Sequence, residues 1–147
     1  MPEFLIASDE VTVIDDIASV LDGPGNTVRH VKAGGAVLGE LQARRADLVI
    51  LDMQIGNMGA MAVCMDLRLE EGAGRVEHTP VLIMADRRAD VFLARRAGAE
   101  GWVVKPFDSL RVRRAVKALL DGGTFHDASY RPTPVMSVPV PGDGDVE

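Results

Sequence analysis

Three acidic side chains and one lysine stand at places in this sequence where they could bind a metal ion or a phosphoryl group. Asp52 ends the apolar run 48–51, which has the length and composition of a strand buried on both faces. Asp9 and Glu10 follow an apolar run near the N-terminus, and Lys105 follows another near residue 104. Carboxylates bind divalent cations or accept phosphoryl groups, and lysine is a compact cation that can contact phosphoryl oxygens.

The elements that must position these side chains alternate between strands and helices. Apolar runs predict four strands, residues 27–31 are interpreted as a short further strand, and apolar residues at helical spacing predict the helices between and after them. The strands are expected at 4–7, 27–31, 47–52, 81–85 and 102–105, and the helices at 13–21, 37–45, 60–70, 86–97 and 109–120. This alternation predicts an α/β fold with a parallel sheet and helices on both faces.

The carboxyl ends of the strands are where such a sheet carries its chemistry. If the first and third strands are neighbours, Asp9 and Asp52 lie side by side. Two carboxylates that close repel each other unless a cation lies between them. A divalent cation would satisfy both, together with a backbone carbonyl and waters. We therefore expect an anionic pocket at this edge, with the ammonium group of Lys105 opposite.

The composition excludes several other classes of protein. The chain has 147 residues and a net charge of −6, which argues for one domain and against a nucleic-acid-binding surface. The single cysteine, Cys64, has the spacing of a buried helix position and is interpreted as inert core. No run approaches the roughly 20 apolar residues that cross a bilayer, and no signal peptide is visible. We expect a cytoplasmic protein without a membrane partner.

The chain divides into a folded part, residues 1–121, and a tail, residues 122–147. Half of the eight prolines lie in this tail, which also carries four acidic residues against one arginine. Such a segment cannot form a core of its own, so we expect it to be mostly extended or disordered. Phe125 and Tyr130 are the residues that could attach its start to the domain or to a partner.

Residues 4–120 resemble the receiver domain of two-component response regulators. The most specific motifs are LDM at 51–53, after a buried strand, and GWVVKPF at 101–107. The resemblance implies a flavodoxin-like fold with five parallel strands. It also implies a signalling module rather than an enzyme. This module would act without an output domain, take part in a phosphorelay and signal by protein–protein contact.

The resemblance assigns roles to particular residues. Asp52 would accept a phosphoryl group from a sensor histidine kinase or a phosphotransfer protein, and Lys105 would contact that group. Mg²⁺ would be bound by Asp9, Asp52 and the backbone carbonyl of Gln54, with Glu10 as a further candidate ligand. The Lys105–Pro106 peptide bond would be cis, an isomer that is uncommon outside X–Pro bonds.

The sequence also departs from the family pattern. Ser8 replaces the first of two acids, which should weaken Mg²⁺ binding. Ala85 stands where the family has a Ser or Thr hydroxyl. A hydrogen bond to a charged group contributes roughly 1.5–3 kcal/mol, so its loss should weaken coupling between Asp52 and the face around Trp102. Receivers usually meet their partners on that face, so Ala85 and Trp102 are the predicted switch positions. Asp86 is expected to cap the following helix; if its side chain points into the pocket instead, its charge would oppose a phosphoryl group.

Three hypotheses about function follow from these residues. The first is a phosphorylatable, atypical receiver, which the retention of Asp9, Asp52 and Lys105 favours. The second is a pseudo-receiver, in which the same fold binds a partner without phosphate. The third is a phosphatase of the haloacid-dehalogenase type, but such enzymes have a second Asp two residues after the nucleophile, where this chain has Gln54. Weak pairing of two copies is a further expectation from the family.

Overall fold

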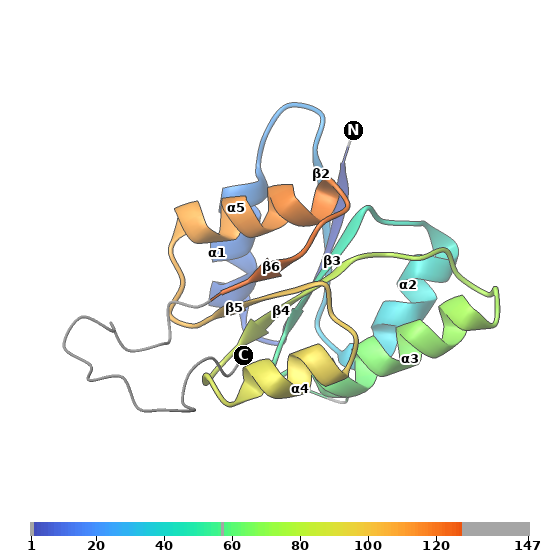
Figure 1. The fold of residues 1–147 in the computed structure, drawn as a ribbon. Coiled ribbons are helices and arrows are strands. Elements are labelled where there is room, and N and C mark those ends of the chain that lie inside the picture. The colour runs from blue at the N-terminus through green and yellow to red at the C-terminus, as the bar shows by residue number, and fades with distance from the viewer. Residues whose placement is uncertain (1, 57, 128–147) are drawn as a thin grey trace, which may run out of the picture.

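The computed structural model describes residues 2–56 and 58–127, which form one parallel sheet between two layers of helices (Figure 1). The strands are β1 (Glu3–Ala7), β2 (Thr27–Val31), β3 (Leu48–Asp52), β4 (Val81–Ala85), β5 (Gly101–Val104) and β6 (Phe125–His126). The helices are α1 (Val11–Leu21), α2 (Val37–Ala43), α3 (Ala60–Gly72), α4 (Asp90–Arg96) and α5 (Ser109–Leu120), with a short 3-10 turn, η1 (Gly34–Ala36), before α2.

The strand order β2-β1-β3-β4-β5-β6 confirms the predicted flavodoxin-like α/β architecture. All neighbouring strands within the described ranges pair in parallel, and β1 lies directly beside β3, with Ala7 opposite Leu51. The residues that follow β1 and the last residue of β3 therefore reach the same edge of the sheet. This register is what brings Ser8, which follows β1, into contact with Asp52.

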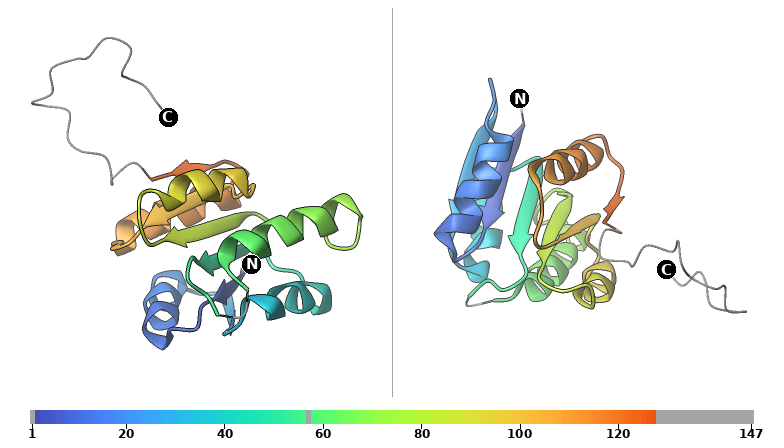
Figure 2. Two further views of the ribbon diagram at one scale, coloured as in Figure 1. Left: turned by 90° about the horizontal axis from the view of Figure 1, so that it is seen from below. Right: turned by 90° about the vertical axis from the view of Figure 1, so that its left-hand side faces the viewer.

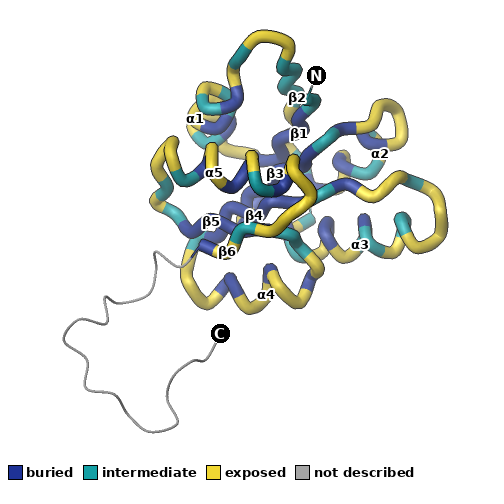
Figure 3. Tube along the Cα trace, turned by 45° about the horizontal axis from the view of Figure 1, so that its top comes forward, coloured by how far each residue is buried: buried dark blue, intermediate teal, exposed yellow. Residues whose placement is uncertain are grey.

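Each face of the sheet buries its own hydrophobic core. Val49 and Leu51 of β3 pack under α2, α3 and α4, whereas Leu48 and Ile50 pack under α1 and α5. The two layers are visible on opposite sides of the sheet in Figure 2, and Figure 3 shows the buried positions concentrated on the central strands. All residues of β3 and β4 are buried, as expected for strands covered on both faces.

The sixth strand was not predicted, because its two residues lie in the segment assigned to the tail. β6 pairs in parallel with β5, so that Gly101 lies opposite Phe125 and Trp102 opposite His126. The carboxylate of Asp127 continues this attachment by accepting a hydrogen bond from the backbone N–H of Val104 at 2.9 Å. The structured part of the chain therefore extends beyond residue 121. The rest of the predicted tail, from residue 128, and Tyr130 with it, lies outside the described residues.

Helix α4 begins at Asp90, four residues later than predicted. The buried carboxylate of Asp90 accepts hydrogen bonds from the backbone N–H groups of Asp86 and Arg87, at 3.1 and 3.0 Å. These bonds hold the preceding residues in turns rather than in a helix. The expectation that Asp86 caps the helix is therefore wrong, and its side chain points elsewhere.

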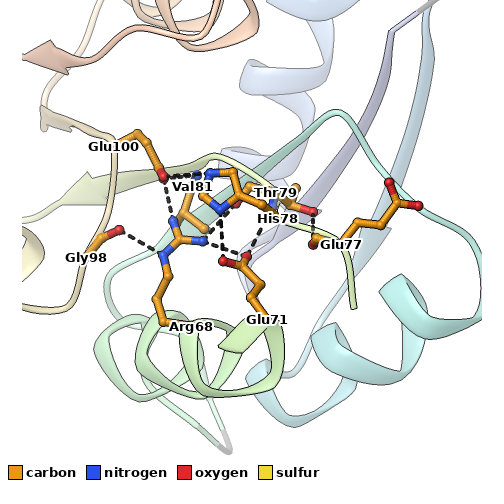
Figure 4. A network of polar contacts seen from close by, with 8 residues as sticks. All are labelled: Arg68, Glu71, Glu77, His78, Thr79, Val81, Gly98 and Glu100. Atoms are coloured by element: carbon orange, nitrogen blue, oxygen red, sulfur yellow. Dashed lines mark hydrogen bonds and ion pairs between the residues drawn. The ribbon is translucent and has the colours of Figure 1, made fainter. Parts of the chain in front are cut away.

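A polar network fastens the end of α3 to the opposite edge of the sheet (Figure 4). Arg68 donates hydrogen bonds to Glu71, to Glu100 and to the backbone oxygens of Gly98 and Thr79. Both carboxylates also contact the ring of His78. The network joins α3 to the segments that enter β4 and β5, so it fixes these strands without taking part in the pocket.

The sequence also predicted a buried cysteine and no membrane-spanning helix. Cys64 on α3 is buried, and this burial raises the pKa of its thiol to about 11, as expected of a core cysteine. Within residues 2–56 and 58–127, no helix has the length and apolar character needed to traverse a lipid bilayer.

Candidate functional site

Asp52 is the centre of a polar cluster at the carboxyl edge of the sheet. It is the last residue of β3, and its side chain is 1% exposed. The hydroxyl of Ser8, which follows β1, donates a hydrogen bond of 2.8 Å to Oδ2. The ammonium group of Lys105, which follows β5, donates one of 2.5 Å to Oδ1. Three strand ends thus converge on one buried carboxylate, and each of its oxygens has a donor.

Lys105 contacts a second carboxylate as well. Its Nζ lies 2.8 Å from Oδ1 of Asp86, the residue that follows β4. Burial alone would lower the pKa of Lys105, but the hydrogen bonds and charges of Asp52 and Asp86 raise it above its ordinary value. The ammonium group is therefore held charged between two anions. Asp86 therefore belongs to the pocket, which was the less favoured of the two orientations that the sequence left open.

Ser8 and Asp9 organise the neighbouring part of the pocket. Ser8 is fully buried, and its hydroxyl oxygen also accepts a hydrogen bond from the backbone N–H of Glu10. Asp9 is exposed, and its Oδ2 accepts a 3.0 Å bond from the backbone N–H of Gly56, in the loop after β3. A Cβ added at Gly56 would lie 3.0 Å from that same oxygen, so the close approach suits glycine. Asp9 therefore lies against the loop that follows Asp52.

The donor set for a metal ion is small. Within the described ranges, no three His, Cys, Asp or Glu side chains lie together in a way that could hold a metal. The predicted ligands Asp9, Asp52 and the backbone carbonyl of Gln54 supply only oxygen atoms, from two carboxylates and one carbonyl. That set suits Mg²⁺, which keeps several waters and needs few protein ligands. Glu10 is exposed, and its role as a further ligand stays a prediction.

The two predicted switch positions lie in the core. Ala85 is buried at the end of β4, and its backbone oxygen accepts a hydrogen bond from the N–H of Lys105 at 2.8 Å. The ring of Trp102 is buried and stacks on His126 with ring centroids 4.2 Å apart. The guanidinium of Arg95 lies 5.5 Å from the centroid of the same ring. Burial and Arg95 lower the pKa of His126.

The Lys105–Pro106 peptide bond is cis, as the resemblance to the receiver family implies.

A parallel α/β sheet with a buried aspartate and a lysine at its carboxyl edge is the arrangement of a class of domains rather than of one protein. The family model of the response regulator receiver domain matches residues 4–117. The chain therefore belongs to the response regulator receiver family of two-component systems. Members of this family act as signalling modules and generally bind Mg²⁺ at their acidic pocket.

Individual relatives agree with this assignment. The chain is 28% identical over 142 residues to the sensory transduction protein RegX3 of Mycobacterium tuberculosis, covering 95% of this chain and 60% of the relative. It is 28% identical over 118 residues to the DNA-binding response regulator MtrA of Mycolicibacterium smegmatis, covering 79% of this chain and 49% of the relative. The chain thus spans between half and three fifths of the curated relatives that it matches.

A solved structure extends the comparison to the fold. The signal receiver domain of a signal transduction histidine kinase from Syntrophus aciditrophicus superimposes with a TM-score of 0.72 at 25% identity, covering 95% of this chain and 98% of that one. MtrA is described as DNA-binding, but that description belongs to a protein about twice as long as the aligned segment. Our expectation that this chain has no nucleic-acid partner gains no support from it and stays a prediction.

Proposed function

We propose that Asp52 accepts a phosphoryl group from a sensor histidine kinase or a phosphotransfer protein. The observation that carries the proposal is the buried carboxylate of Asp52 with the ammonium group of Lys105 at 2.5 Å. In the transfer, one Oδ atom of Asp52 forms a bond to phosphorus, while the bond between phosphorus and the donor's nitrogen or oxygen breaks. The donor leaves with the electron pair of that bond.

The neighbouring residues have separate tasks in this reaction. Lys105 contacts the phosphoryl oxygens and neutralises part of their charge, which is the main way in which proteins assist phosphoryl transfer. Ser8 holds the carboxylate of Asp52 in place through its 2.8 Å bond. Asp9, Asp52 and the carbonyl of Gln54 would hold Mg²⁺, which supplies further neutralisation of phosphoryl charge when bound. Because Ser8 replaces an acid, we expect Mg²⁺ affinity to be lower than with two adjacent carboxylates.

The output is a protein contact over the face around Trp102, formed by α4, β5 and α5, where β6 also pairs with β5. The indole itself is buried, so the contact must use residues that cover it. Phe92 and Leu93 on α4 are 53% and 45% exposed, and Arg95 and Arg96 lie exposed at the end of the same helix. This surface combines apolar and basic groups, so the partner that fits it presents apolar and acidic side chains.

The pseudo-receiver remains the second candidate, and two observations favour it. Both oxygens of Asp52 already have hydrogen-bond donors within the chain, and Ala85 supplies no hydroxyl for a phosphoryl group. In that account, the fold binds its partner over the same face without any phosphate. The two candidates differ in one measurable property, the uptake of a phosphoryl group.

Intact mass spectrometry distinguishes them. The protein is incubated with Mg²⁺ and acetyl phosphate, beside the Asp52→Asn variant, which keeps the size of the side chain but removes the nucleophilic carboxylate. A phosphoryl adduct on the wild type that is absent from the variant supports the proposal. No adduct on the wild type, together with no affinity for Mg²⁺, leaves the pseudo-receiver.

A further inference from the structure

We propose that Asp86 is an anionic switch residue, which shares Lys105 with Asp52 in the unphosphorylated protein and leaves the pocket when Asp52 is phosphorylated. The inference rests on the proposed function of Asp52 and adds a mechanism of regulation to it. In this mechanism the chain signals by expelling a carboxylate, rather than by attracting a hydroxyl to the phosphoryl group.

The contacts of Asp86 make it depend on Lys105. Its Oδ1 lies 2.8 Å from Nζ of Lys105, and its side chain is 27% exposed. Its Oδ2 is buried and has no hydrogen-bond partner among the described residues. A partly buried carboxylate with one oxygen unpaired is stabilised mainly by its counter-ion. If Lys105 pairs with another anion, Asp86 loses the counter-ion that stabilises it in the pocket.

Phosphorylation supplies that other anion. A phosphoryl group brings roughly 1.5 to 2 negative charges and three acceptor oxygens, whereas the Asp52 carboxylate has one charge and two oxygens. Lys105 already lies 2.5 Å from Asp52, so the new oxygens are formed within its reach. The ammonium group then pairs with the stronger anion, and Asp86 faces a like charge at short range, which favours its departure.

The backbone connects this departure to α4. The N–H groups of Asp86 and Arg87 are bonded to the carboxylate of Asp90, the first residue of α4. On the same helix, Arg95 lies over the ring of Trp102. A movement of Asp86 is therefore transmitted through Asp90 to the helix that covers Trp102. This route needs no hydroxyl at position 85, which accounts for how the chain could signal with Ala85.

The test uses beryllium fluoride with Mg²⁺ as a stable mimic of the phosphoryl group. Trp102 is the single tryptophan of the sequence, so its fluorescence reports on the α4 face. In Asp86→Asn the charge is removed at nearly constant size, and Asp16→Asn, on the exposed face of α1, is the control for net charge. Because repulsion is removed, we expect Asp86→Asn to bind the mimic about tenfold more tightly than wild type. We also expect the change in Trp102 fluorescence on binding to be smaller in Asp86→Asn than in the wild type. Asp16→Asn should behave as the wild type in both measurements. Asp86→Ala carries the same expectation.

The outcomes separate the two claims. If wild type and Asp86→Asn bind the mimic with equal affinity, or if the fluorescence change of Asp86→Asn is undiminished, the role of Asp86 is overturned while the role of Asp52 stands. If neither protein binds the mimic and neither is phosphorylated by acetyl phosphate, the proposed function itself fails and this inference fails with it.

Discussion

Lys105 contacts both carboxylates of the pocket, so its protonation affects the stability of the folded state. Burial lowers the pKa of Lys105, but the hydrogen bonds and charges of Asp52 and Asp86 together raise it above its ordinary value. A lysine whose pKa is raised in the folded state stabilises that state fully below its unfolded pKa, about 10.4. This stabilisation is lost as the pH rises through the folded pKa.

We therefore expect the free energy of unfolding of the wild type to fall above about pH 10 more steeply than that of Lys105→Met, which has no ammonium group to lose. Urea denaturation at a series of pH values measures both profiles. If the two profiles run parallel through this range, Lys105 is not held by the two carboxylates in solution.

Ser8 occupies the position of an acid in the family pattern, and the structure shows what it does instead. Its hydroxyl bonds Asp52 directly. In Ser8→Asp a second carboxylate is placed beside Asp52, which should raise the affinity for Mg²⁺ at least tenfold, roughly the scale on which groups supporting a metal act. The same change should destabilise the metal-free protein, because two buried acids repel each other. Calorimetric titration with Mg²⁺ and thermal unfolding with and without the metal measure the two effects. Unchanged affinity would place the metal away from Ser8 and Asp52.

At the scale of elements, the loop after β3 packs closely against Gly34 in η1. A Cβ added at Gly34 would lie 1.9 Å from the backbone oxygen of Met58. Gly34→Ala must therefore push this loop away, and we expect a loss of about 2 kcal/mol in the free energy of unfolding. Gly39 lies within α2, and a Cβ added there would meet no atom within 4 Å, so Gly39→Ala should instead gain roughly 0.5–1 kcal/mol. Chemical denaturation of the pair is the measurement, and equal effects would contradict the packing described here.

The elements also show which parts of the fold can be read from sequence. Apolar runs predicted β1, β3, β4 and β5 within one residue, because burial on both faces leaves few polar positions in a strand. β2 was also predicted, although none of its residues is buried. β6 was missed because a two-residue strand has no periodicity to detect. The position of Asp86 in the pocket was the less favoured of two alternatives, for a different reason. Either Asp86 or Asp90 could bond backbone N–H groups near the start of this helix, and only the three-dimensional structure shows that Asp90 does so while Asp86 contacts Lys105.

For the molecule as a whole, the boundary of the folded unit lies beyond the predicted residue 121. Asp127 accepts the N–H of Val104, and His126 stacks on Trp102. A chain that stops after Asp121 loses both contacts and should lose about 2 kcal/mol of stability. A chain that stops after Asp127 keeps both and should unfold at the wild-type temperature. Calorimetry of the two truncations distinguishes these boundaries, and equal unfolding temperatures for all three chains would show that β6 contributes nothing.

In the proposed function, the phosphoryl chemistry of the whole domain depends on a single carboxylate, that of Asp52. An acyl phosphate is reduced by borohydride to an alcohol, which converts the modified aspartate into homoserine. The protein is treated with Mg²⁺ and acetyl phosphate, reduced and then digested for peptide mapping by mass spectrometry. We expect homoserine at position 52 and at no other position. Homoserine at another acidic residue, or unmodified Asp52 in a sample that carries phosphoryl mass, would contradict the account.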